Sequence, residues 1–305
     1  MAIDPCFAAL LADPRNELRA PPPNVALADL RKGNKAFLLS VPVPPVHALE
    51  QLEIDGASGR IALRIYRPSA ARNIPATLFC HGGGFVLGDL DTHDALCSRL
   101  ALSAGCVVVS VEYGRAPENK FPGPVEDCFS ALSWLSVHSS RLNIDPESLA
   151  LCGDSAGATL AAAAAMLARA RGITVRYLAM IYPITDAACD TASMREFERG
   201  YLLTRSAMQW FWNCYLGTPA DAENPLASIL RADLTGFPPT TLVTAEFDPL
   251  RSEGEAFADR LRDSGVAVVA RRYLGMLHGF AGMPHLTPMA TRVIEDVAAD
   301  LRAAF

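Results

Sequence analysis

The 305-residue chain is long enough for one large domain with an appendage, because a single core stops growing at ~250 to 300 residues. Half of the residues are hydrophobic and one fifth are charged, a composition that argues against a disordered chain. A net charge of −6 argues against nucleic acid as a partner, since contact with phosphates needs a basic surface.

The N-terminal region does not resemble an export signal. Asp4 and Pro5 stand where a signal peptide would carry basic residues and then an unbroken apolar segment. The apolar run from Leu160 ends at Arg169, short of the ~18 to 20 residues that span a bilayer. The eight cysteines show no paired metal-ligand spacing. We therefore expect a cytoplasmic protein without a bound metal or a membrane partner.

Residues 1–45 contain two helix-like segments, 7–19 and 25–39, before any strand pattern. Three prolines, Pro21 to Pro23, separate them. A helical segment that cannot join a sheet must lie over another part of the molecule. It could form a lid or simply pack on the domain surface, and the sequence leaves both alternatives open.

Strand and helix patterns alternate through most of the remaining chain. Strands are predicted at 51–55, 61–67, 77–80, 106–112, 149–152, 176–182, 238–245 and 266–272. Helices are predicted at 93–103, 125–139 and 253–264, and a C-terminal helix carries an apolar stripe of Val293, Val297, Leu301 and Phe305. Nearly continuous apolar strands between helices predict a mostly parallel sheet of about eight strands, with helices on both faces.

The alternation is interrupted between Pro183 and Phe237. This stretch has no strand pattern and contains a helix-like run rich in aromatic residues. We therefore expect residues 46–183 and 236–305 to form one α/β core, with residues 1–45 and 184–235 outside it.

A Gly-x-Ser-x-Gly pentapeptide, Gly153 to Gly157, follows an apolar strand and precedes a poly-alanine helix. At such a sharp turn the serine takes a strained backbone conformation, and the flanking glycines relieve the clash that side chains would cause. Ser155 is therefore the candidate nucleophile. The first helical turn offers free N–H groups where an oxyanion would form.

A serine needs a base, and the base needs a carboxylate that fixes its tautomer. His278, flanked by glycines just after the last strand, is the favoured base over His285. Asp248, in the loop after the strand 238–245, is the favoured acid over Glu246. The order Ser, Asp, His is that of the α/β-hydrolase fold. The histidines at 47, 93 and 138 are expected on the solvated surface.

A donor site for the oxyanion is predicted from three successive glycines. Gly82 to Gly84 follow the strand 77–80, and glycines leave their N–H groups unobstructed. Gly83 and Gly84, with the N–H of Ala156 after the nucleophile, are the predicted donors. The alternative is a merely flexible turn.

The sequence resembles the hormone-sensitive lipase family of α/β-hydrolases, bacterial carboxylesterases of the Gly-Asp-Ser-Ala-Gly subgroup. Four segments carry the resemblance: His81-Gly82-Gly83-Gly84, Gly153-Asp154-Ser155-Ala156-Gly157, Asp248-Pro249-Leu250 and His278-Gly279-Phe280. The resemblance implies a cap built from residues 1–45 and 184–235 over the core. It also implies that His81 orients the glycine loop rather than acting as a second base.

One segment departs from the family pattern. Tyr113 to Glu118 reads Tyr-Gly-Arg-Ala-Pro-Glu, where the family has Tyr-Arg-Leu-Ala-Pro-Glu. The contacts that the arginine and leucine make in relatives are therefore not expected at Gly114 and Arg115.

These observations predict a serine carboxylesterase that acts on a small-molecule ester through an acyl-enzyme on Ser155, without a cofactor or metal. An amidase or peptidase is the alternative enzyme. A small-ligand receptor on the same fold is the alternative outside catalysis, because a fold does not dictate function.

Aromatic residues of the inserted segment are candidates for the substrate pocket. We expect one or two of them to line it and the others to hold the cap to the core, since neighbouring helix positions point ~100° apart. The candidates are Phe85, Trp210, Phe211, Trp212 and Tyr215. A pocket filled from above favours acyl chains of two to six carbons. A homodimer is also expected, because the strand 266–272 is predicted to lie at the sheet edge.

Overall fold

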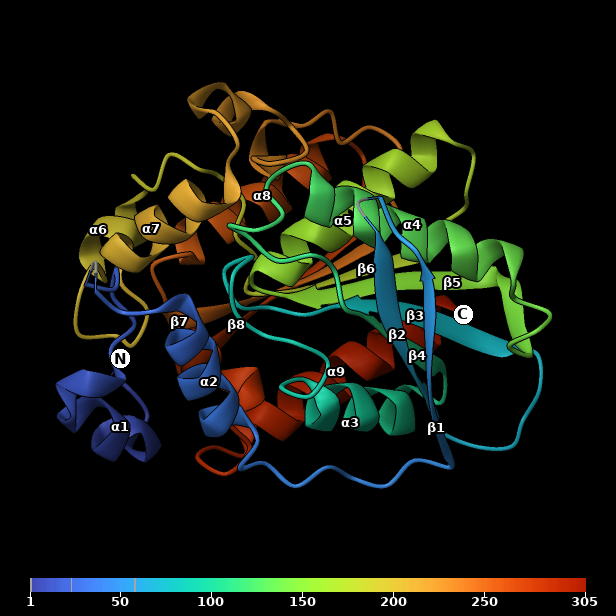
Figure 1. Ribbon diagram of the computed structural model, residues 1–305, viewed down its shortest axis with the longest axis horizontal. Coiled ribbons are helices and arrows are strands. Elements are labelled where there is room, and N and C mark those ends of the chain that lie inside the picture. Colours follow the sequence, from blue (N-terminus) through green and yellow to red (C-terminus); the bar gives the residue numbers. More distant parts are fainter. Residues whose placement is uncertain (1, 23, 58) are drawn as a thin grey trace.

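The computed structural model describes residues 2–22, 24–57 and 59–305 (Figure 1). Pro23, in the run of three prolines, and Ser58, between the first two predicted strands, lie outside the described residues. At its centre lies an eight-stranded sheet of order β1-β2-β4-β3-β5-β6-β7-β8. β2 pairs antiparallel with β1 and β4, and the other neighbours pair parallel. The strands are β1 (Ala48–Asp55), β2 (Arg60–Arg67), β3 (Ile74–Cys80), β4 (Val107–Val111), β5 (Ile144–Asp154), β6 (Tyr177–Ile181), β7 (Thr240–Phe247) and β8 (Val268–Leu277).

Helices cover both faces of the sheet, which confirms the predicted fold class (Figure 1). One face carries α4 (Gly123–Val137), α5 (Ala156–Ala170) and α8 (Arg251–Asp263), and the other carries α3 (Asp94–Ala104) and α9 (Met289–Ala304). Val293, Val297 and Leu301 of the predicted α9 stripe are fully buried, whereas Phe305 is only partly buried. In the described parts of the chain, no helix combines the length and hydropathy needed to cross a bilayer.

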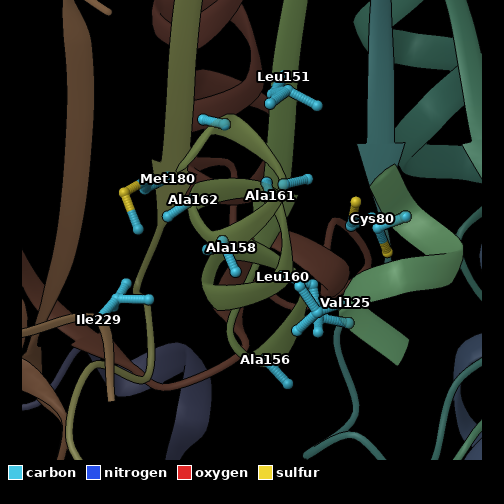
Figure 2. Packing of buried hydrophobic residues seen from close by; sticks show 14 of the residues in the cluster. Cys80, Val125, Leu151, Ala156, Ala158, Leu160, Ala161, Ala162, Met180 and Ile229 are labelled. Carbon is cyan, nitrogen blue, oxygen red and sulfur yellow. The ribbon is translucent and has the colours of Figure 1, made fainter. Parts of the chain in front are cut away.

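The alanine-rich helix α5 packs closely on the centre of the sheet. Figure 2 shows Ala158, Ala161 and Ala162 between side chains of the strands, among them Leu151 of β5 and Met180 of β6. All five of these residues are fully buried. Alanine favours helix and adds little bulk, so the helix axis can approach the strands. This packing holds the start of α5 against the carboxyl ends of β3 and β5.

The last strand is longer than predicted. The prediction placed it at 266–272 with a loop before His278, but β8 continues to Leu277. The glycine that suggested a loop, Gly275, instead sits at an irregularity with a φ of 77°, where its N–H donates to Glu246 Oε2 at 2.7 Å. His278 therefore follows the strand directly. β8 is the last strand in the sheet order, as predicted for an edge.

The N-terminal and inserted segments lie outside the sheet and touch each other. Their α-helices are α1 (Ala8–Ala12), α2 (Leu27–Leu38), α6 (Ala192–Glu196) and α7 (Arg205–Tyr215), and the short 3₁₀ helices are η1 (Pro5–Phe7), η2 (Pro14–Asn16), η3 (Pro219–Glu223) and η4 (Ile229–Arg231). The prediction of one helix at 7–19 was wrong. Asp13 caps a new turn that begins at Pro14, because proline cannot continue the preceding helix. Leu18 forms an isolated bridge with Leu203 and thereby joins the two segments.

A buried carboxyl group lies where the inserted segment leaves and returns to the core, a region that we call its neck. Glu253 Oε1 accepts the N–H of Thr185 at 2.7 Å and that of Asp186 at 3.4 Å, just after β6. The returning chain closes the neck, where Leu230 N–H donates to Thr185 O at 2.9 Å. Glu253 is almost completely buried, and burial raises its pKa to about 8.

Candidate active site

Ser155 occupies the sharp turn between β5 and α5. Its φ of 52° and ψ of −122° are strained for a residue with a side chain. A Cβ on Gly157 would overlap the carbonyl oxygen of Cys80, and one on Gly153 would overlap the backbone of Gly157. Only glycines therefore fit on either side of the serine at this close approach of helix and sheet.

Ser155, His278 and Asp248 form a continuous chain of hydrogen bonds. Ser155 Oγ lies 3.0 Å from His278 Nε2, and His278 Nδ1 lies 2.8 Å from Asp248 Oδ2. The second oxygen of Asp248 accepts the N–H of Leu250 at 2.8 Å. The three side chains come from the carboxyl ends of β5, β7 and β8 and are all buried. The fold thus brings together the three residues that the sequence analysis selected.

The two alternative residues lie elsewhere. Glu246 accepts the N–H of Gly275 and so joins β7 to β8. His285 is exposed, and its ring packs edge-on against Phe37 with centroids 6.0 Å apart. These contacts give both residues structural positions without a link to Ser155.

Three backbone N–H groups near Ser155 are available as donors. Within the described residues, no group accepts a hydrogen bond from the N–H of Gly83, Gly84 or Ala156. Gly83 and Gly84 have φ angles of 119° and 60°, which side chains rarely allow. Both glycines line the same pocket as Ser155.

A second carboxylate, Asp154, anchors the glycine loop. Its Oδ1 accepts the N–H of Gly82 at 2.8 Å and lies 3.3 Å from His93 Nε2. Burial opposes the charged form of both groups, yet their mutual attraction lowers the pKa of Asp154 and raises the pKa of His93. This pair was not predicted from the sequence, although an acidic residue between a buried strand and the nucleophile was a signal that a partner was needed.

The expectation for His93 was wrong, because it is buried in this pair rather than exposed. His47 is exposed as predicted, and His138 is partly buried and stacks on Trp134 with centroids 4.5 Å apart. Nothing in the sequence around His93 indicated its burial, since the pairing with Asp154 is made across 61 positions, the difference between 154 and 93.

His81 lies beneath the glycine loop. Its Nδ1 is 2.9 Å from Gly82 O, and its ring stacks on Tyr113 with centroids 4.2 Å apart. Burial, together with the nearby His93, lowers the pKa of His81 to about 3, so the ring stays neutral. The Tyr113 hydroxyl donates to His81 O at 2.8 Å. These contacts suit a residue that supports the loop.

The segment that departs from the family pattern supports the same loop by other contacts. A Cβ on Gly114 would overlap the side chain of Asn119, so this glycine makes room for Asn119. Arg115 donates to the carbonyl of Gly88 and lies 3.6 Å from Glu112. The arginine therefore ties the strand β4 region to the chain that follows the glycine loop.

The pocket above Ser155 has a volume of about 340 Å³. Of the predicted aromatic residues, Trp210 and Phe211 line it. Phe85, Trp212 and Tyr215 do not, so two of the five candidates border the pocket, in line with the expected one or two. Phe85 stacks on Tyr215 with centroids 3.9 Å apart, and Trp212 packs beside both rings. Their place is therefore the contact between the inserted segment and the core.

Comparison with known proteins identifies a family for this chain. The model of a family described as having the α/β-hydrolase fold matches residues 77–282. This range includes Ser155, Asp248 and His278. The carboxylic ester hydrolase LipN of Mycobacterium tuberculosis is 39% identical over 279 residues, covering 88% of this chain and 74% of that protein. An arylesterase of Saccharolobus solfataricus is 35% identical over 273 residues, covering 89% of each chain.

A solved structure agrees over almost the whole length. The hyperthermophilic esterase of the archaeon Pyrobaculum calidifontis superposes with a TM-score of 0.95 at 38% identity and covers 99% of both chains. The shared fold includes the segments outside the sheet as well as the core. The chain therefore belongs to the α/β-hydrolase family, as its resemblance to the hormone-sensitive lipase family predicted.

Proposed function

We propose that this protein is a serine carboxylesterase, with Ser155 as nucleophile, His278 as base and Asp248 as acid. The hydrogen-bonded chain from Ser155 Oγ through His278 to Asp248 is the observation that carries the proposal. The similar proteins named as ester hydrolases and esterases support it.

The geometry accounts for each step of ester hydrolysis. His278 Nε2 takes the Ser155 proton as Oγ attacks the carbonyl carbon, and Asp248 holds the ring tautomer and stabilises the imidazolium. The negative oxygen of the tetrahedral intermediate is bound by the N–H groups of Gly83, Gly84 and Ala156. His278 then protonates the leaving alcohol. A water molecule, deprotonated by His278, hydrolyses the acyl-enzyme on Ser155.

A covalent label tests this function directly. A fluorophosphonate ester should add its phosphonyl group to Ser155, as located by peptide mass spectrometry, and should stop hydrolysis of nitrophenyl butyrate. Ser155→Ala should take no label. Labelling elsewhere with equal loss of activity would mean that another residue is the nucleophile. Hydrolysis of nitrophenyl butyrate without any Ser155 label would also contradict the proposal.

We further propose that residues 1–45 and 184–235 form a cap and that its rings limit the acyl chain to about two to six carbons. Trp210 and Phe211 border the pocket, whereas Trp212 and Tyr215 serve as matched controls outside it. Alanine at 210 or 211 should raise decanoate hydrolysis relative to butyrate hydrolysis. Alanine at 212 or 215 should leave the ratio unchanged. An unchanged ratio in all four variants would show that these rings do not set chain length.

Two properties of the whole molecule complete the proposal. β8 is the last strand of the sheet, with Val269 and Leu274 exposed, and Gly275 O accepts the N–H of Asp4 at 3.0 Å. The remaining edge suits a homodimer, because an apolar edge strand is usually covered. A monomer mass in light scattering at micromolar concentration would refute the dimer.

The eight free cysteines suit the reducing cytoplasm, which cell fractionation would test.

A further inference from the structure

One wall of the pocket leads away from Ser155 along helix α3. Thr92 and His93 border the pocket just before this helix, followed by Leu96 and then Arg99. His93 marks the end near the reaction, since it contacts Asp154 beside the nucleophile. Arg99 lies six residues further along. With a rise of ~1.5 Å per residue, it is ~9 Å from His93 along the helix axis.

Apolar residues of neighbouring elements line the pocket beside α3, and we call this part of the pocket the arm. Ala290 and Ile294 of α9 border the pocket and are buried, and Val41 borders it from the N-terminal segment. α3 and α9 pack against each other on the same face of the sheet (Figure 1). A chain that leaves the reacting carbonyl in this direction would therefore pass apolar side chains before it reaches the Arg99 guanidinium.

Within the described part of the chain, Arg99 differs from the other cations around the pocket in having no acidic partner. Arg15 is paired with Asp13 and Arg19 with Glu17. Near α3, Lys35 binds Asp89 and Asp91, and Arg64 binds Asp91 and Asp94, so these acids are already engaged. Among the residues that the structure describes, none forms a hydrogen bond or ion pair with the Arg99 side chain, which is half-buried.

We propose that Arg99 is a specificity-determining residue and that the enzyme prefers esters carrying a carboxylate at the far end of the molecule. A guanidinium presents a planar fork that binds a carboxylate through two parallel hydrogen bonds. The apolar arm would hold the connecting methylene groups. With C–C bonds of about 1.5 Å, a zigzag chain of about seven bonds covers the ~9 Å that separate His93 from Arg99 along the helix axis. The inference rests on the proposed esterase function.

Matched pairs of substrates isolate the effect of the distal charge. One series consists of nitrophenyl monoesters of dicarboxylic acids, each compared with the methyl-ended ester of equal length. A second series has a butyryl group on ω-hydroxy acids, again with methyl-ended counterparts. The two series show whether the acyl half or the alcohol half occupies the arm.

The variants are Arg99→Gln, Arg99→Lys and the control Arg171→Gln, which removes an exposed positive charge at the end of α5, outside the pocket lining. In one series, the wild type should favour the carboxylate-ended ester, mainly through KM. Arg99→Gln should reduce this preference by about 10- to 100-fold, the value of a charge-assisted hydrogen bond. It should leave the methyl-ended esters within about threefold, and Arg99→Lys should be intermediate.

The proposal is overturned if the wild type favours the methyl-ended ester in both series, or if Arg171→Gln lowers the preference as much as Arg99→Gln. A binding measurement separates this failure from failure of the esterase function. The monoamide of octanedioic acid should bind Ser155→Ala in calorimetry, and adding Arg99→Gln should weaken it by the same factor. Equal binding to both variants would overturn the role of Arg99 whatever the turnover.

Discussion

A single methyl group at Gly84 should disable the donor loop. The glycine has a φ of 60°, in the left-handed region, and a Cβ there would overlap the ring of Phe211 from the inserted segment. Gly84→Ala therefore meets two obstacles at once. The first is backbone strain, and the second is the overlap with the ring of Phe211.

The free-energy cost of holding the methyl group in an unmoved loop favours movement of the loop. The left-handed conformation costs a residue with a side chain ~1 to 2 kcal/mol, and overpacking costs ~1 to 3 kcal/mol more. Shifting the loop relieves both but carries the N–H of Gly84 away from the oxyanion. Loss of one such donor raises the barrier by ~3 to 4 kcal/mol, a fall of ~10² to 10³ in kcat.

Kinetics with nitrophenyl butyrate, with folding checked by thermal unfolding, would measure this effect. Phe211→Ala in the Gly84→Ala background should recover at least tenfold in kcat, because it removes the overlap but not the strain. Gly172→Ala is the control for strain alone, since Gly172 has a φ of 71° and open space around the position of a Cβ. A folded Gly84→Ala enzyme with normal kcat would refute the donor role of this loop.

Three further predictions concern the triad of Ser155, His278 and Asp248 and the neck of the inserted segment. Ser155→Ala and His278→Ala should each abolish esterase activity without unfolding, and the double variant should be little worse than either, since losses in such a unit do not add. Asp248→Asn should lower kcat by ~10⁴, whereas Glu246→Gln should change it far less; the reverse ranking would reassign the acid. Above its ordinary pKa of 4.5, Glu253 loses its proton in the unfolded chain but keeps it in the folded protein up to about pH 8. Stability should therefore fall as pH rises through this window, and Glu253→Gln should make the Tm less dependent on pH between 5 and 8; an equal slope would contradict the buried neutral carboxyl.

Local patterns were sufficient for the core of the fold because each element there agrees with its own surroundings. The apolar strand before Ser155 and the alanines after it predict the strand, turn and helix that the structure contains. The prediction was less accurate where two segments decide the outcome together. β8 extends past Gly275 because Glu246 on β7 accepts the N–H of that glycine, a contact that no local pattern reveals.

The residues of the site show the same contrast between local patterns and contacts made by the fold. Residues with a motif, such as Ser155 and His278, lie side by side as predicted, because the glycines beside Ser155 indicate its sharp turn and His278 follows the last strand. Residues whose position depends on distant parts of the chain were not predicted. His93 and Arg99 lie on or beside one unremarkable helix, and only the fold places the first against Asp154 and the second in the pocket.

Three histidines lie in or beside the site, and their partners decide which one can act as the base. His93 has one ring nitrogen 2.9 Å from the Thr92 hydroxyl and the other beside Asp154, so neither is free for substrate. His81 is buried, with Nδ1 beside Gly82 O and the ring stacked on Tyr113. His278 alone among the three links an acid on Nδ1 to a nucleophile on Nε2. The same side chain thus supports the loop at two positions and is placed for proton transfer at the third, because burial and partners differ.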